Sequence, residues 1–169
     1  MTPSQQASLE GLVGRSLSGV EIAAIDGHIE AGDFGVVAEM LSAGRSRLVP
    51  YYISERGVRA MAVLPRHRHA LLCVLRDAVQ QTPAWLIPTL TAAGIPAEDH
   101  AALADDLACA HRWLLSAEGL DVGTEAVQRM LDLIAAAVPE AAPACAAVQT
   151  MGLEPDKIHH SAIVAVFRG

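Results

Sequence analysis

Hydrophobic side chains recur at helical spacing over residues 1–44 and predict two helices joined by a very short turn. Ser18 and Glu21 form a capping box at the start of the first helix, which should end near Gly32. A second amphipathic run follows directly and should end near Gly44. Segment 1–44 is therefore predicted to be an N-terminal helical hairpin.

The next segment, 45–54, has a different pattern. Residues 47–53 are rich in β-branched and aromatic side chains, and Pro50 interrupts them. Because proline removes a backbone donor, such a run is confined to a sheet edge or to an extended segment. The pattern predicts one short extended arm or edge strand near 47–53.

Helical patterns return over residues 55–138 and predict the core of the protein. We expect a short helix capped by Ser54 and ended by Pro65, and a later one with Thr82 and Pro83 as its first positions. Thr124 should cap a further helix. The longest amphipathic run begins after Pro96, and its expected apolar face consists of Leu103, Leu107, Ala110 and Leu114, with Trp113 as a further candidate.

The last segment, 139–169, is predicted to be a looser Ala/Pro-rich tail. It ends in a final helix that starts near Pro155 or in a short strand over 162–167, and the pattern does not decide between them. Taken together, residues 1–169 are predicted to form a mainly α, single-domain helical bundle of about seven helices.

Composition favours the same fold class. Of the 169 residues, 52% are hydrophobic, many of them alanine, but only 4% are aromatic, which favours closely packed helices over a β-sandwich. The three cysteines are an odd number, which argues for a reducing compartment rather than a disulfide framework. No signal-peptide pattern opens the chain and no apolar run is long enough for a bilayer. These features predict a protein that is cytoplasmic at synthesis, without a membrane partner.

Charge is distributed unevenly along the chain. The window 45–76 contains seven arginines and one acidic residue, a net charge of +6, whereas the remaining residues carry a net charge of −13. Arginine binds carboxylates in a bidentate manner and is enriched at interfaces, as is tyrosine. The window therefore predicts a partner-binding surface that consists of Arg45, Arg47, Tyr51, Tyr52, Arg56, Arg59, Arg66 and Arg68.

The expected partner is an acidic protein surface, or another copy of the chain in a homo-oligomer, where contacts between unlike surfaces generate rings or filaments. The alternative is that these arginines pair with acids of their own chain. Nucleic acid is a third interpretation, which the overall acidity and the lack of a motif disfavour.

Catalytic chemistry finds little support in the sequence. His67 and His69 would share a face only on a strand, and neighbouring acids such as Asp105 and Asp106 do not face each other on a helix. Standard motifs for nucleophiles, phosphates, dinucleotides and zinc are absent. We therefore predict no catalytic, cofactor-binding or metal site, and no enzymatic activity.

Two stretches carry a resemblance to a known group of proteins. Residues 47–54, Arg-Leu-Val-Pro-Tyr-Tyr-Ile-Ser, and residues 119–131, Gly-Leu-Asp-Val-Gly-Thr-Glu-Ala-Val-Gln-Arg-Met-Leu, resemble segments of small Ala-rich helical structural proteins of tailed bacteriophages. The resemblance implies a virion-associated role at the capsid, neck or tail, and it carries over no catalytic residue. The arginine-dense window and the final 162–167 depart from that pattern.

The sequence thus predicts a non-enzymatic structural or assembly protein that acts through protein–protein contacts. Two alternatives stay open. One is a small phage-encoded inhibitor or adaptor that binds a host protein, and the other is a helical enzyme without a standard motif.

Overall fold

The computed structural model describes residues 1–168. Over this range the chain forms ten α-helices, one 3-10 turn and four short strands, so the predicted mainly α fold is confirmed. The helices outnumber the expected seven because several are short. In addition, one helix precedes the two that were expected within residues 1–44. The final segment is helical, which decides between the two structures left open for 162–167.

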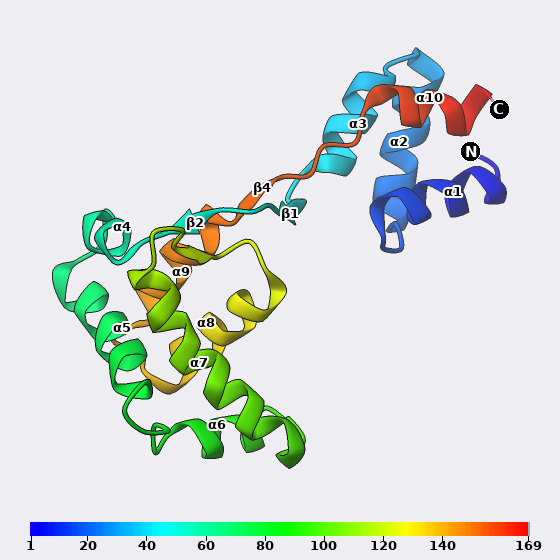
Figure 1. Cartoon of the computed structure of the whole chain (residues 1–169). Helices are drawn as coiled ribbons and strands as arrows, with labels where there is room; N and C mark the ends of the chain where they lie inside the picture. Colours follow the sequence, from blue (N-terminus) through cyan, green and yellow to red (C-terminus); the bar gives the residue numbers. More distant parts are fainter. Residues whose placement is uncertain (169) are drawn as a thin grey trace. The chain divides into compact units, whose positions relative to one another are not determined.

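The chain divides into two compact units, each with its own apolar cluster. The smaller unit contains residues 1–47 and the chain from Pro155 onward, and the larger unit contains residues 48–154. The chain leaves the smaller unit in β1 (Ser46–Leu48) and returns to it in β4 (Leu153–Pro155). These strands are the two members of one sheet, as the ribbon in Figure 1 shows.

The smaller unit is a set of four helices drawn from both ends of the sequence. These helices are α1 (Pro3–Val13), α2 (Gly19–Ala31), α3 (Phe34–Ser42) and α10 (His160–Arg168). Leu9, Ile25, Val37 and Ile163, one from each helix, are completely buried in its cluster. The predicted capping box of Ser18 and Glu21 is confirmed, and so is the end of α2 at Gly32.

The larger unit contains the remaining elements. They are β2 (Tyr52–Ile53), α4 (Glu55–Ala60), α5 (Pro65–Ala78), α6 (Leu86–Ala92), η1 (Ala97–Asp99), α7 (His100–Leu115), β3 (Leu120–Asp121), α8 (Glu125–Ala137) and α9 (Ala142–Met151). Helix α5 packs against α7 and α9, and α8 packs against α9. Figure 1 shows these helices gathered in one group.

The expected Ala/Pro-rich tail needs correction. Residues 142–151 form α9, and the side chains of Ala141, Ala144 and Cys145 are completely buried in the core of the larger unit. Small side chains allow this helix to approach α5 and α8 closely, so its alanines reflect packing rather than a loose segment.

Proline positions account for two wrong helix boundaries. Pro65 begins α5 instead of ending the helix before it, because a proline at the first helical position loses no intrahelical hydrogen bond. Helix α6 begins at Leu86 rather than at Pro83. With this later start, Pro88 falls in the first turn, where its missing N–H is harmless.

The predicted extended arm is confirmed, with a partner that the sequence did not indicate. Strand β2 pairs antiparallel with β3, which places Tyr52 opposite Asp121 and Ile53 opposite Leu120. Ile53 and Leu120 are buried. The segment just before Thr124 therefore contains a strand.

Candidate functional site

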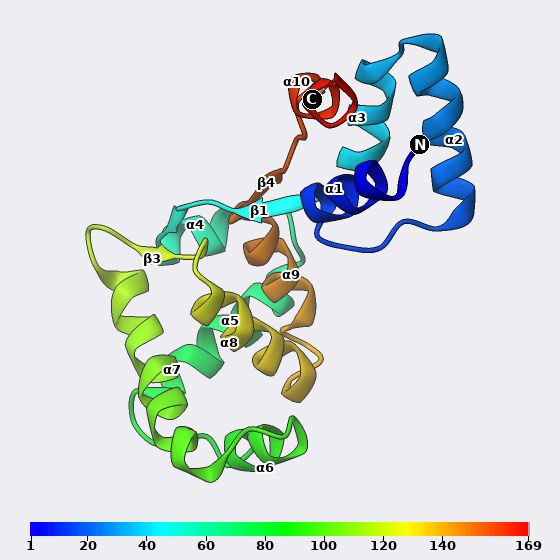
Figure 2. The ribbon, with the colours of Figure 1, turned by 90° about the vertical axis from the view of Figure 1, so that its right-hand side faces the viewer.

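An open groove of about 370 Å³ lies on the larger unit. Figure 2 shows α7, β3 and the start of α8, the three elements that supply most of its lining, following one another along the chain. Tyr52 of β2 completes the lining. All four elements belong to the larger unit, so the groove is formed within one compact body.

Helix α7 contributes a single face to the groove. Asp106, Cys109, Ala110 and Trp113 line it, and their spacing of three, four and seven residues places them on one side of a helix. Trp113 is 51% exposed, although the sequence made it a candidate for the buried face. The buried stripe of α7 instead consists of Leu107, Ala110 and Leu114. An indole at the edge of that stripe is free to contact a partner.

The pairing of β2 with β3 brings Tyr52 to the groove. The tyrosine is 59% exposed, and the Oδ1 atom of its pairing partner, Asp121, accepts hydrogen bonds from the backbone N–H groups of Tyr51 (3.1 Å) and Gly123 (3.0 Å). The loop between α7 and β3 turns at Gly119, whose φ is +86°. These contacts fix the tyrosine-bearing strand against the loop that forms one end of the groove.

The lining combines apolar surface with carboxylates of one sign. Leu120, Val127 and Met130 contribute aliphatic surface. The acidic residues of the lining are Asp106, Glu118 and Asp121, and no basic residue lines the groove. A groove of this kind favours an apolar group that also carries a positive charge, because a cation is attracted both to carboxylates and to the faces of tryptophan and tyrosine rings.

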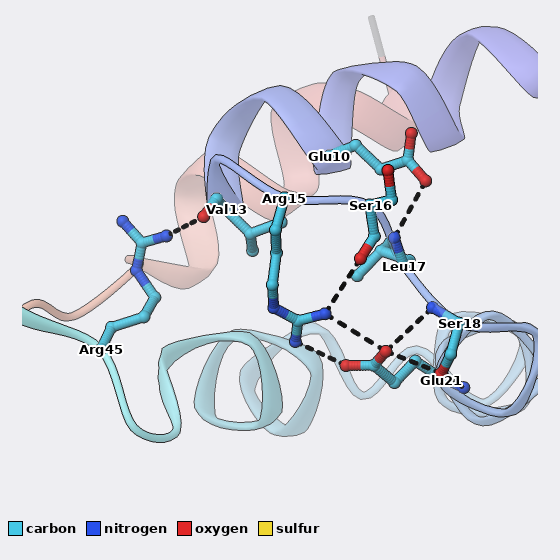
Figure 3. A network of polar contacts seen from close by, with 8 residues as sticks. All are labelled: Glu10, Val13, Arg15, Ser16, Leu17, Ser18, Glu21 and Arg45. Atoms are coloured by element: carbon cyan, nitrogen blue, oxygen red, sulfur yellow. Dashed lines mark hydrogen bonds and ion pairs between the residues drawn. The ribbon is translucent and has the colours of Figure 1, made fainter. Parts of the chain in front are cut away.

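The predicted partner-binding arginines are divided between the two units. Arg45 and Arg47 lie in the smaller unit, and the other predicted residues lie in the larger one. Arg45 donates to the carbonyl oxygen of Val13 over 2.6 Å, as Figure 3 shows, and forms an ion pair with Asp156. Arg45 therefore ties together the two sequence segments of the smaller unit.

The arginines of the larger unit follow α4 and the first turn of α5. Arg59 pairs with Glu55 over 2.5 Å, and Arg66 pairs with Glu140 over 3.1 Å. Arg68 donates to the carbonyl oxygen of Met61 over 3.0 Å. These contacts support the alternative that several of the arginines pair within their own chain.

The same arginines nevertheless remain a basic surface. Arg59 and Arg66 are exposed, and Arg56 is exposed without an ion-pair partner in the part of the chain that the structure describes. A hollow of about 150 Å³ beside them is lined by Arg59, Pro65, Arg68, His69 and Leu72. We call Arg56, Arg59, Arg66 and Arg68 the basic face of the larger unit.

Cys109 is the one cysteine of the groove lining, and no histidine lines the groove. His67 Nδ1 lies 2.7 Å from the carbonyl oxygen of Glu140, and His69 Nε2 lies 3.4 Å from Cys73 Sγ. Within residues 1–168, no group of three or more histidine, cysteine or acidic side chains is placed to hold a metal ion. Burial raises the pKa of the Cys145 thiol to about 12, so this thiol stays protonated.

A polar network around Glu21 stabilises the fold of the smaller unit. Figure 3 shows the Glu21 carboxylate between the Arg15 guanidinium, at 2.5 Å, and the backbone N–H of Ser18, at 2.9 Å. Hydrogen bonds from Arg15, and then from the Ser18 backbone and hydroxyl, lower the pKa of Glu21 to about 2. A hydrogen bond from the backbone N–H of Leu17 lowers the pKa of Glu10 as well. The network closes the turn between α1 and α2.

Sequence reasoning identified Tyr52 but missed the groove. Its other residues lie on one face of α7, on the loop and strand β3 after it, and on the start of α8. A tryptophan outside the leucine stripe of α7 was the available signal. Comparison with protein-family models, with curated proteins and with solved structures found no match. Among the helices of residues 1–168, none has both the length and the apolar character needed to cross a membrane.

Proposed function

We propose that this chain is a non-enzymatic assembly protein that works through protein–protein contacts, with the groove of the larger unit as its binding surface. The observation that carries the proposal is the exposure of Trp113 and Tyr52, which both line a mostly apolar hollow. Tryptophan and tyrosine are enriched among the residues that dominate binding energy at protein interfaces. A hollow that buries such rings gives a partner both contact area and a defined position.

The resemblance of residues 119–131 to structural proteins of tailed bacteriophages supports an assembly role at the capsid, neck or tail of a virion. Seven of these residues line the groove, namely Gly119, Leu120, Asp121, Thr124, Ala126, Val127 and Met130. The segment that carries the resemblance therefore forms part of the groove.

Site-specific photo-cross-linking tests the proposal. Tyr52 is replaced by p-benzoylphenylalanine, which keeps an aromatic ring in the groove, and cells that express the chain are irradiated. Tyr51 is the matched control, because it is an exposed tyrosine next in sequence that does not line the groove. We expect a discrete protein adduct from position 52 that is much weaker from position 51.

The same experiment is repeated with Trp113→Ala, which removes the other exposed aromatic side chain of the lining. The adduct at position 52 should then fall at least about tenfold, since a central aromatic side chain typically contributes about 2 kcal/mol or more. An adduct that Trp113→Ala leaves unchanged would show that the groove is not the binding surface.

A further inference from the structure

The larger unit carries two surfaces of opposite charge, the groove and the basic face. We infer that the groove of one copy receives the basic face of a second copy, so that copies of this chain associate head to tail. The inference rests on the proposed function and names the partner of the same groove.

The groove presents carboxylates that have no cation of their own. Asp106 and Glu118 are exposed, line the groove and form no ion pair with residues 1–168. The nearby Arg112 lies 3.9 Å from Asp105 and is not part of the lining. Closing the groove with an apolar partner would leave these carboxylates without water or a counter-charge, which is costly. A partner that brings arginine removes that cost.

The basic face offers the complementary set. Arg56 is exposed and has no acidic partner in the described part of the chain. The ion pairs of Arg59 and Arg66 are solvent-exposed, and such pairs contribute little, so they can be exchanged for contacts with another copy. Leu64, exposed by 55%, lies between these arginines in sequence and supplies an apolar side chain.

This combination of side chains fits the lining of the groove. A guanidinium group binds carboxylates in a bidentate manner and also stacks on tryptophan and tyrosine rings. Aliphatic surface from Leu64 matches that of Val127 and Met130. The hollow beside Arg68 and His69 can in turn receive an acidic side chain of the other copy.

The two surfaces lie on different elements and share no residue. The groove is built by α7, β3, α8 and Tyr52, whereas the basic face is built by α4 and the start of α5. A contact between unlike surfaces leaves one free groove and one free basic face on every pair of copies. Association of this kind continues into rings or open chains instead of stopping at a two-fold dimer.

A pair of charge-reversal variants tests the inference in the full chain. The groove variant is Asp106→Lys with Glu118→Lys, and the face variant is Arg56→Glu with Arg66→Glu. All four positions are exposed, so folding should be retained, which circular dichroism checks. Sedimentation velocity from about 1 μM to about 1 mM then gives the oligomeric state of each variant alone and of their equimolar mixture.

The wild-type chain should form species larger than a dimer, and its association should weaken with salt because exposed charges are screened over about 3 Å at 1 M ionic strength. Each variant alone should weaken association at least about tenfold, since like charges then face each other. The mixture should associate again, because the intact groove of the face variant meets the intact basic face of the groove variant, and the reversed groove and reversed face also carry opposite charges.

Matched controls carry the same change in net charge elsewhere. Glu98→Lys with Asp99→Lys, and Arg129→Glu with Lys157→Glu, should associate like the wild type. A wild-type chain that stays monomeric at about 1 mM overturns the inference. So does association that survives both variants or fails to return in the mixture. A groove that binds a different protein would still give the Trp113-dependent adduct at position 52, so failure here is distinguishable from failure of the proposed function.

Discussion

At the scale of single residues, the groove depends on how closely two backbones approach. A Cβ atom added at Gly123 would lie 1.8 Å from the carbonyl oxygen of Val49, and one at Gly119 would lie 2.8 Å from that of Ile53. The chain before α8 therefore lies directly against the segment that carries Tyr52. Only glycine permits this approach, and the approach brings the tyrosine to the groove.

Gly123→Ala should destabilise the larger unit by about 1–3 kcal/mol, because the added methyl group forces the two backbones apart. Both tryptophans of the chain, Trp85 and Trp113, lie in this unit, so the midpoint of urea unfolding followed by tryptophan fluorescence reports on it. Gly11→Ala is the control, since its methyl group meets no atom within 4 Å. An unchanged midpoint for Gly123→Ala would show that this close approach is not required.

The residues of the candidate site were only partly predictable, for a physical reason. Tyr52 and the basic face were found because their side-chain types are enriched at interfaces wherever they lie. The contact of Arg45 with Asp156 spans 111 positions of sequence, and the pairing of Tyr52 with Asp121 spans 69, so neither leaves a local pattern. The ion pairs of Arg45 and Arg66 depend on such distant partners, whereas the partner of Arg59 lies only four residues away.

At the scale of elements, the sequence predicted helix caps correctly but did not predict the elements that depend on packing against distant parts of the chain. Ser18, Ser54 and Thr124 each accept a hydrogen bond from a backbone N–H three residues later, as their positions before apolar runs predicted. A cap is local, so the sequence around it contains the whole interaction. Helix α9 and strand β3 depend on distant partners, and the alanines of α9 and the glycines that flank β3 resemble those of loose segments.

The cap of α2 makes the smaller unit sensitive to acid. Because the ordinary pKa of Glu21 is 4.5 and its folded value is about 2, the charged carboxylate stabilises the folded state above pH 4.5. That contribution is lost progressively as the pH falls from 4.5 towards 2. Glu10, whose pKa is also lowered, changes in the same direction.

Glu21→Gln should therefore reduce the protection of α2 amides at neutral pH, and its difference from the wild type should shrink below pH 4.5. Hydrogen–deuterium exchange of residues 19–31, corrected for the intrinsic pH dependence of exchange, measures this. Glu30→Gln is the control on the same helix, because Glu30 is exposed and forms no ion pair within residues 1–168. A difference between Glu21→Gln and wild type that stays constant down to pH 2 would contradict the linkage.

At the scale of the whole molecule, the notable feature is how the chain is divided. The smaller unit draws α1, α2 and α3 from one end of the sequence and α10 from the other, while the larger unit is one continuous segment. Each unit buries its own apolar cluster. The length of 169 residues gave no sign of this division, because both clusters follow the same helical periodicity.

This division predicts that a single change in α10 acts on helices more than a hundred residues away and leaves the intervening chain intact. Ile163 is completely buried against the cluster of α1, α2 and α3, so Ile163→Ala should cost the smaller unit about 2–5 kcal/mol. Hydrogen–deuterium exchange should then accelerate in residues 3–42 and remain unchanged in residues 55–151. Val20→Ala, a similar truncation at a side chain that is 82% exposed, should change neither region. Because each unit holds its own core, faster exchange in α5, α7 and α9 after Ile163→Ala would mean that the two clusters unfold together, and the chain would then be one cooperative body instead of two.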